Sequence, residues 1–496
     1  MKKYIYFPTW NNHWLDISEE LLDKKIAEPI LWIGDYKHLE KARKRFGNEV
    51  VKDRDFFVFK SHQISNFKYN CKSNDFFLSN DYIITKDKAL KMMDRLDDFS
   101  MMSRIDREAI FNNVVIWILN KFERTLPDAL IAVEHPHTHV QFTIFQICKY
   151  LNIPCVKFNS WLPIPVVNLQ NSDTGELIKK QIKIDEVTIN QYSTFFQNYI
   201  ENIFNKGQKY EASHIELVRQ RSNNNSWKLQ KSVNFLKDIF RKYKSKNNFL
   251  ESKLYNPLDP FKISPFQRLS FIRKRKKNLV NSLNKNVSKS VKLNVKYVYF
   301  GLHYEPERTT LPDGGVFHDQ FLALIKLREI IPEKMIIYVK EHPSMFFDSL
   351  TGYKGRSPVF YSLIKNIKGV KLLNHDVSTL ELIRNSVFTA TITGTIGLES
   401  AILGKKSLIF GNSWYDGCPN TIKWTSKVSY ELIHNTKLYQ IDAIIQFFDN
   451  LLRDKCVIGF LNSRTEFRLN KFKFKGFEDI QYKGIYDLIY QFLKLV

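Results

Sequence analysis

The sequence predicts an α/β protein with two parallel β-sheets, each covered by helices. Two stretches of the chain alternate short apolar strands with helical segments, which is the pattern of parallel sheets. A chain of 496 residues is also too long for one hydrophobic core, so two domains with extra segments are expected. We therefore expect a first α/β domain at 1–162, a basic helical insertion at 163–294, a second α/β domain at 295–430, and C-terminal helices at 431–496 that pack back on the domains.

In the first domain, short apolar runs indicate four strands separated by helical segments. The third run ends in an acid, Glu134. Strands are expected at 30–34, 50–52, 128–134 and 152–156, and helices at 36–46, 107–121 and 140–151.

The second domain repeats this alternation of strands and helices. Strands are expected at 297–300, 335–339, 370–373, 387–392 and 407–410, and helices at 317–330, 357–367, 378–385 and 396–403. Two further helical stretches follow at 430–453 and 484–496.

The segment between the two domains is polar and basic, within a chain of large positive charge. Lys and Arg number 75 against 51 Asp and Glu, a formal net charge of +24. This balance attracts nucleic acid, anionic lipid or phosphorylated substrates, unless it reflects only lysines spread over the surface. The basic run at 273–277 indicates either docking to anionic lipid or a polyanionic acceptor, or a solvated helix face. It has no aromatic interleaving or helix-turn-helix pattern, so we expect no nucleic acid partner.

Cysteine usage and hydropathy favour a cytoplasmic protein. The five cysteines form no CxxC pair and no metal-ligand spacing, which predicts reduced thiols. The apolar run at the N-terminus is too short for a signal peptide, and no apolar segment has the length of a membrane span. Any membrane contact is therefore expected to be peripheral.

The sharpest functional pattern is a strand that runs into a Thr/Gly turn and then a helix. Backbone N–H groups at the start of such a helix attract phosphate. Gly394 and Gly397 let the backbone approach an anion, and Thr393 and Thr395 add hydroxyl donors. Glu399, about one turn into the helix, is placed to accept hydrogen bonds from ribose hydroxyls. The alternative is an ordinary helix cap with small residues for packing.

A second pattern ends the strand predicted at 335–339. Lys340, Glu341 and His342 follow this strand, and Pro343 prevents it from continuing. Ligands of open parallel sheets bind at the carboxyl ends of strands, so Lys340 and His342 are expected to meet a phosphate. The alternative is a structural histidine.

Two further loops carry clustered titratable residues. His303, Glu305 and Glu307 follow the strand at 297–300, and neighbouring acids shift each other's pKa, which suits acid–base or nucleophilic chemistry at a sugar carbon. The alternative is a charged surface turn.

In the first domain Glu134 precedes three histidines whose spacing matches no standard zinc site, so we expect no metal and assign Glu134 as an acid or base.

These residues resemble bacterial capsule and surface-polysaccharide biosynthesis glycosyltransferases, among them the Kdo transferases that build capsule linkers. The resemblance covers about 296–417 and, more weakly, about 129–158. It rests on the loop at 303–310, the strand end at 340–343, the turn at 393–399 and the Gly-Lys pair at 404–405.

The resemblance implies a GT-B fold, in which two Rossmann-like domains face each other across a cleft. The donor nucleotide would bind the second domain and the acceptor the first. In the Kdo-transferring relatives the donor is a CMP-sugar whose phosphate contacts the His-Pro motif, a role that falls to His342 here with Thr393 and Thr395 assisting. Glu134 and Glu307 match the catalytic carboxylates, and no metal or other cofactor is needed.

The residue patterns and the resemblance together give one set of expected site residues. Catalysis is expected from Glu307, Glu134, Glu305 and His303, and donor binding from His342, Lys340, Pro343, Thr393, Gly394, Thr395, Gly397 and Glu399.

The expected activity is transfer of Kdo or a related acidic sugar from a CMP-sugar to a glycan or lipid-linked acceptor. The protein would act in the cytoplasm or at the inner face of the cytoplasmic membrane, with peripheral contact to anionic lipid. Two alternatives remain: a UDP-sugar-dependent transferase or UDP-N-acetylhexosamine 2-epimerase, and a non-catalytic polysaccharide export or binding protein.

Overall fold

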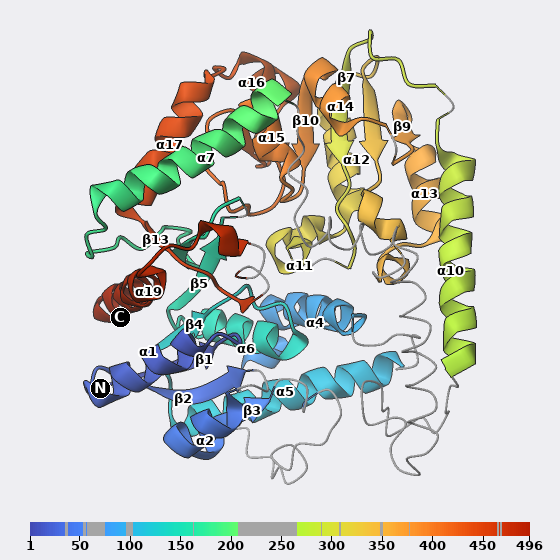
Figure 1. Cartoon of the computed structure of the whole chain (residues 1–496). Helices are drawn as coiled ribbons and strands as arrows, with labels where there is room; N and C mark the ends of the chain where they lie inside the picture. The colour runs from blue at the N-terminus through green and yellow to red at the C-terminus, as the bar shows by residue number, and fades with distance from the viewer. Residues whose placement is uncertain are drawn as a thin grey trace. The chain divides into compact units, whose positions relative to one another are not determined.

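The computed structural model describes most of the chain as two compact units. The described residues are 1–34, 38–52, 56, 75–95, 103–161, 163–206, 265–288, 290–306, 309–347, 351–375, 377–463, 466 and 469–496. Among them, the first unit contains Met1–Ser193 and Asn450–Val496, and the second contains 194–206 and 265–449 (Figure 1).

The first unit is built on a mostly parallel sheet in the order β13-β6-β5-β4-β1-β2-β3. Strands β1 to β5 pair in parallel, whereas β6 runs antiparallel to β5 and β13 antiparallel to β6. The strands are β1 (Lys2–Phe7), β2 (Ala27–Gly34), β3 (Val50–Lys52), β4 (Ala129–Ala132), β5 (Cys155–Ser160), β6 (Val166–Asn171) and β13 (Cys456–Ile458). A strand from near the C-terminus thus completes the sheet that the N-terminal strands begin.

Helices cover this sheet, and the chain passes between the units within α7 and α17. Sequence explains the start of α5, where Ser103 and Asp106 form a capping box. The helices of this unit are α1 (Asn12–Asp23), α2 (Leu39–Phe46), α4 (Asn80–Met93), α5 (Arg104–Arg124), α6 (His139–Tyr150) and α19 (Phe477–Leu495), with 3₁₀ turns η1 (Gly47–Glu49), η3 (Asp75–Leu78) and η7 (Asn470–Phe472). The two helices shared between the units are α7 (Glu186–Lys206) and α17 (Ile441–Asp454).

The second unit is a wholly parallel sheet in the order β12-β11-β10-β7-β8-β9. Its central strand β7 is buried on both faces, because Val298 and Phe300 enter one core while Tyr297 and Tyr299 enter another. The strands are β7 (Tyr297–Gly301), β8 (Ile336–Lys340), β9 (Val370–Leu373), β10 (Phe388–Thr391), β11 (Ser407–Ile409) and β12 (Thr421–Lys423).

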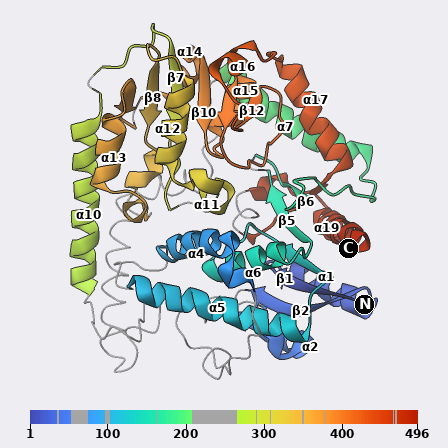
Figure 2. The same cartoon turned by 180° about the vertical axis from the view of Figure 1, so that it is seen from behind.

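Seven helices and three short turns of the described chain surround this second sheet. Helix α10 lies alongside α13 in both views (Figures 1 and 2). The helices are α10 (Pro265–Asn286), α11 (Thr310–Asp313), α12 (Gln320–Ile330), α13 (Pro358–Lys365), α14 (Thr379–Asn385), α15 (Ile396–Ile402) and α16 (Tyr430–Asn435), with η4 (Gly315–His318), η5 (Pro343–Phe346) and η6 (Gly352–Lys354).

The two α/β units confirm the predicted fold class of two Rossmann-like domains, and α10 supplies a basic helix within the predicted insertion. Pairing of Gly301 with Lys340, and of Phe300 with Ala390, places the carboxyl ends of β7, β8 and β10 at one edge of the second sheet. Strands β1, β6, β12 and β13 were not predicted, and β6 joins the first sheet although it lies within the segment expected to be a helical insertion. Within the described ranges, no helix has the length and apolar character of a membrane span.

Candidate functional site

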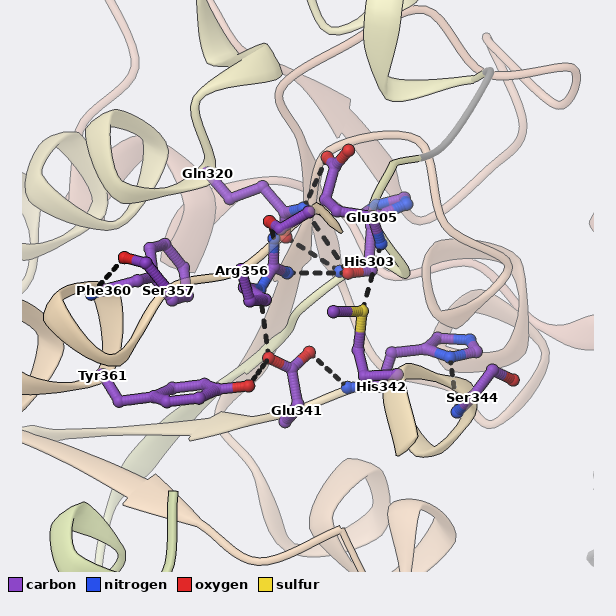
Figure 3. Close-up of polar contacts among 12 residues, drawn as sticks. His303, Glu305, Gln320, Glu341, His342, Ser344, Arg356, Ser357, Phe360 and Tyr361 are labelled. Carbon is purple, nitrogen blue, oxygen red and sulfur yellow. Dashed lines mark hydrogen bonds and ion pairs between the residues drawn. The ribbon is translucent and has the colours of Figure 1, made fainter. Parts of the chain in front are cut away.

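A buried ion pair fixes the chain where β8 ends. Glu341, the first residue after β8, accepts hydrogen bonds at Oε2 from Arg356 Nε at 3.0 Å and Tyr361 OH at 2.9 Å, and at Oε1 from the His342 backbone N–H at 2.7 Å. The Glu341 and Arg356 side chains are almost wholly buried, at 0% and 3% exposure. Arg356 Nη2 also donates to the His303 carbonyl oxygen at 2.7 Å (Figure 3). This guanidinium therefore joins the ends of β7 and β8.

Electrostatics keep this arginine charged in spite of its burial. Burial acts to lower the pKa of Arg356, but the carboxylates of Glu341 and Glu305 raise it, and the net shift is upward. Burial and the Glu341 carboxylate together raise the pKa of Tyr361, so its hydroxyl remains a donor. Arg356 is thus a buried cation that interacts with two carboxylates of the second unit.

The loop after β7 is held by a second carboxylate. Glu305 is buried and accepts hydrogen bonds at Oε1 from Gln320 Nε2 and Thr310 Oγ1, both at 2.9 Å. Gln320 Oε1 in turn accepts the His303 backbone N–H at 2.8 Å. Gln320 begins α12, so this helix and the loop are tied together through one amide side chain. In this position the Glu305 carboxylate organises the loop.

His303 joins the end of β7 to the Thr/Gly turn after β10. Its Nε2 accepts the Thr393 backbone N–H at 3.1 Å and lies 3.0 Å from Thr391 Oγ1. Thr391 Oγ1 also accepts the Gly394 backbone N–H at 3.3 Å. Burial, assisted by the Arg356 charge, lowers the pKa of His303 to about 3. The ring is neutral near pH 7 and acts as a brace for the turn.

Glycine is required at position 394 because the turn and the histidine touch it. A Cβ there would lie 2.8 Å from Thr391 Oγ1 and 3.2 Å from His303 Cε1. A Cβ at Gly397 would collide with the Tyr415 hydroxyl. The two predicted glycines are thus needed for close packing of the turn.

Two buried hydroxyls stand at this edge of the sheet with their hydrogen bonds unmade. Thr393 Oγ1 and Ser344 Oγ have no partner within the described residues. A buried hydroxyl without a partner costs about 1–3 kcal/mol, so a ligand that bonds to it gains affinity. By contrast, Thr395 Oγ1 donates to Glu399 Oε1 at 3.1 Å, and Glu399 is buried in α15.

His342 presents a ring N–H beside the strand end. Its Nδ1 accepts the Ser344 backbone N–H at 3.2 Å, which places the proton of the neutral ring on Nε2. Pro343 begins η5 directly after His342, and the His342 ring is half-buried, near the Tyr304 ring. The His342-Pro343 pair therefore favours the tautomer of His342 in which Nε2 carries the proton and can donate a hydrogen bond.

Lys340 holds the loop that precedes α14. Its Nζ donates to the Val377 carbonyl oxygen and to Thr379 Oγ1, the latter at 2.8 Å. Because Thr379 begins α14, the buried ammonium ties the end of β8 to the start of that helix.

The remaining predicted residues lie elsewhere. Glu307 lies outside the described residues. Glu134 belongs to the first unit, follows β4, and accepts a hydrogen bond from Asn462 Nδ2. In the same loop His135 Nε2 contacts Asn159 Oδ1 at 3.0 Å. Burial lowers the pKa of His139 to about 3. Among the described residues, no group of three His, Cys, Asp or Glu side chains is arranged to hold a metal ion.

The segment that carries most of this network matches a known family. Residues 314–435 match the model of the capsule polysaccharide biosynthesis protein family. The predicted resemblance is confirmed over this segment. It contains the Glu341–Arg356 pair, His342 and the Thr/Gly turn. A search of the curated proteins found no match.

Solved structures with similarity to the chain include two transferases and an epimerase. The β-Kdo 2,7 transferase of Thermosulfurimonas dismutans KpsC is 11% identical, with 72% of this chain and 90% of that chain covered and a TM-score of 0.29. Its β-Kdo 2,4 transferase is 14% identical, with 66% and 88% covered and a TM-score of 0.24. A UDP-GlcNAc 2-epimerase from Methanocaldococcus jannaschii is 11% identical, with 91% and 99% covered and a TM-score of 0.23.

Sequence reasoning missed the partners that organise the edge. Arg356, Gln320, Tyr361 and Ser344 were not predicted, although each contacts a predicted loop or lies in it. One signal was available, because an acid that directly follows a buried strand requires a cation. The choice of Arg356 among many basic residues depends on the tertiary fold.

Proposed function

We propose that this chain is a glycosyltransferase of capsule or surface-polysaccharide biosynthesis. The observation that carries the proposal is the edge formed by the ends of β7, β8 and β10, of which β8 and β10 lie in the segment that matches the family. Ligands of open parallel sheets bind at this edge. Here it offers an imidazole N–H on His342 and the buried hydroxyls of Ser344 and Thr393, which have no partner in the part of the chain that the structure describes. These are donors suited to phosphate oxygens.

The proposed donor is a CMP-sugar that carries Kdo or a related acidic sugar. His342 Nε2 would donate to its phosphate, and Thr393 with Thr395 and the turn at Gly394 would contact the same group. Lys340, Pro343, Gly397 and Glu399 would complete the donor site. We assign no metal or other cofactor to this reaction, because N–H and hydroxyl donors would balance the charge that develops on the leaving phosphate.

In the proposed reaction an acceptor hydroxyl oxygen bonds to the anomeric carbon of the sugar. The bond between that carbon and the phosphate oxygen breaks, and CMP leaves with the electron pair. A carboxylate takes the acceptor proton, a role that we assign to Glu134 or Glu307. The acceptor would be a glycan or a lipid-linked glycan at the inner face of the cytoplasmic membrane.

A nucleotide titration tests the donor assignment. The full-length protein is titrated with CMP, UDP, GDP and dTDP while its thermal unfolding is recorded. A nucleotide that binds only the folded state stabilises it by about 2.7 kcal/mol at a hundred times its Kd. We expect CMP to stabilise selectively. Selective stabilisation by UDP would instead favour a UDP-sugar transferase or a 2-epimerase, and no response to any nucleotide would favour a non-catalytic binding protein.

A further inference from the structure

The sheet of the first unit grows in two directions from β1. The chain adds β2 and β3 on one side of β1, and then β4 and β5 on the other side. In open α/β sheets, the crevice outside the carboxyl ends of two strands that separate in this way is the usual place for a ligand. The same rule selects the ends of β7 and β10 in the second unit, where the site described above lies. In the first unit it selects the segments that follow β1 and β4.

Two hydrogen bonds from the chain beyond β13 hold these segments together. Strands β1 and β4 pair in parallel up to their last residues (Figure 1). After β1, Thr9 Oγ1 donates to the Leu461 carbonyl oxygen. The next residue, Asn462, donates from Nδ2 to Oε1 of Glu134, the half-buried acid that follows β4. The Glu134 carboxylate therefore lies close to the segment after β1, within one unit.

Trp10 presents an indole ring to solvent in the segment after β1. The residue is 49% exposed, which is unusual because tryptophan is mostly buried in folded proteins. Within the described ranges its ring has no aromatic neighbour and its indole N–H has no hydrogen-bond partner. Its backbone is held in place, since the Trp10 carbonyl oxygen accepts a hydrogen bond from His38 Nε2 at 2.9 Å. The ring is thus an apolar face that a ligand can cover.

The next residue, Asn11, leaves the start of α1 uncapped. An asparagine at the N-cap usually accepts a backbone N–H of the first turn, but the Asn11 side chain makes no such bond. Its Nδ2 donates instead to Glu466 Oε2 at 3.1 Å. Asn11 is only 8% exposed, and its Oδ1 has no partner in the part of the chain that the structure describes. Asn11 Oδ1 therefore lacks a donor, and the N–H groups that begin α1 lack a side-chain acceptor.

We propose that the segments after β1 and β4 bind a pyranose ring of the acceptor, an inference that rests on the glycosyl transfer proposed above. A pyranose has hydroxyl donors for Asn11 Oδ1 and oxygen acceptors for the N–H groups that begin α1. It also has a face of C–H groups, which the negative face of the Trp10 indole attracts. A small rotation of the Asn11 side chain brings its buried oxygen to the ligand. A phosphate would supply acceptors alone, and a lipid chain only apolar surface.

Saturation-transfer difference NMR on the full-length protein, without nucleotide, tests this site. The probes are methyl β-D-galactopyranoside and methyl β-D-glucopyranoside, with sorbitol as a polyol that has hydroxyls but no ring. We expect saturation of both pyranosides, strongest at the C–H groups of one ring face, and none of sorbitol. Trp10→Ala should bind the pyranosides roughly tenfold more weakly, since contact with one aromatic ring contributes about that factor. Trp10→Phe keeps an aromatic face and should retain most of the affinity.

Tyr439→Ala is the matched control for an exposed aromatic side chain. Tyr439 is 41% exposed and belongs to the second unit, so this variant should bind the pyranosides as the wild type does. Thermal unfolding checks that Trp10→Ala, a change at an exposed side chain, leaves the fold intact. Absence of saturation transfer to both pyranosides, equal affinity in the wild type and Trp10→Ala, or equal losses in Trp10→Ala and Tyr439→Ala would each overturn the inference.

The result is separable from that of the nucleotide titration. Stabilisation by a nucleotide without pyranoside binding would overturn this site and leave the proposed transferase in place. Pyranoside binding that depends on Trp10, together with no response to any nucleotide, would support the site and count against the proposed donor.

Discussion

The side chains that hold the carboxyl ends of the parallel strands differ in chemistry between the two sheets. In the second unit, a buried ion pair between Glu341 and Arg356 and a neutral buried His303 hold the strand ends. In the first unit, Asn159 Oδ1 contacts His135, and Asn159 Nδ2 donates to Asn168 Oδ1 and Gln170 Oε1 at 3.1 and 3.2 Å. The edge of the second unit depends on a buried pair of opposite charges. The edge of the first unit depends on amides, of which Asn168 is buried and Asn159 and Gln170 are partly exposed, and on buried Lys157, whose Nζ lies 3.0 Å from His135 Nδ1.

The two edges are expected to differ in rigidity. An enclosed charge has no alternative to its partner, because removal of that partner leaves an ion in a medium of low dielectric. A half-buried amide such as Asn159 can exchange its partner for water at small cost. We therefore expect the edge of the second unit to keep one geometry, as a phosphate site requires, and the edge of the first unit to adapt.

Arg356→Met is the strongest test of this comparison. It leaves the Glu341 carboxylate buried without its cation, and we expect the second unit to lose about 3–5 kcal/mol of stability. Amide hydrogen exchange in β8 and in β5 measures the loss separately for each unit. The double variant Glu341→Gln, Arg356→Met should recover part of the loss, because no charge is then left unpaired. If the single variant exchanges like the wild type in β8, the ion pair does not hold this edge.

The pH dependence of stability tests the neutral histidine. The pKa of His303 is lowered to about 3 in the folded state, against about 6.5 when unfolded. Between these values the unfolded chain binds a proton that the folded unit excludes, so stability falls as the pH is lowered, by at most about 1.4 kcal/mol per pH unit. His303→Gln should remove this contribution.

Denaturation by urea at pH 6 and pH 4 measures the contribution of His303 to the pH dependence of stability. The wild type should lose about 2–3 kcal/mol more than His303→Gln over this interval. His434→Gln, which replaces an exposed histidine, is the matched control. His13 and His139 of the first unit, whose pKa values burial also lowers to about 3, contribute in the same direction and are unchanged in both variants. Equal pH dependence in all three proteins would show that His303 binds its proton as readily in the folded unit as in the unfolded chain.

Much of the fold could be predicted from local patterns, whereas the network at the site could not. The runs at 297–300 and 335–339 predict β7 and β8 because both strands are buried on their two faces and read as apolar throughout. Strand β1 was missed although its last four residues are wholly apolar, because a short N-terminal run has no preceding helix to reveal the alternation.

At the site, too, local patterns predicted which residues end the strands but not which residues contact them. The positions of His303, His342 and Thr393 follow from strands that end at one edge, and that topology is readable from the alternation of strands and helices. The partner of Glu341 could not be predicted from the sequence. Arg356 is separated from it in the chain by η5 and η6 and contacts the carboxylate only in the folded unit. Sequence therefore identified the ends of the strands but not the contacts between their loops.

His342→Ala separates ligand binding from folding at the rigid edge. The half-buried ring accepts a hydrogen bond from the Ser344 N–H and lies near the Tyr304 ring, and we expect its removal to change stability by about 1 kcal/mol. If Nε2 donates to a phosphate, the lost bond should weaken nucleotide binding by about 1.5–3 kcal/mol, or roughly 10- to 150-fold. Calorimetric titration with the nucleotide that stabilises the wild type measures this. Unchanged affinity would remove His342 from the donor site.

Asn159→Ala should give the smallest effect and thereby complete the comparison. The substitution removes the contact with His135 and two hydrogen bonds to Asn168 and Gln170. His135 and Gln170 are half-buried, so water can replace these two contacts, whereas the buried Asn168 Oδ1 loses the donor that Asn159 supplies. We expect about 1 kcal/mol of lost stability in the first unit. Hydrogen exchange in β5 measures it against the Arg356→Met effect in β8. A loss of stability as large as that of Arg356→Met would mean that water does not replace the contacts of Asn159. The edge of the first unit would then be as rigid as that of the second.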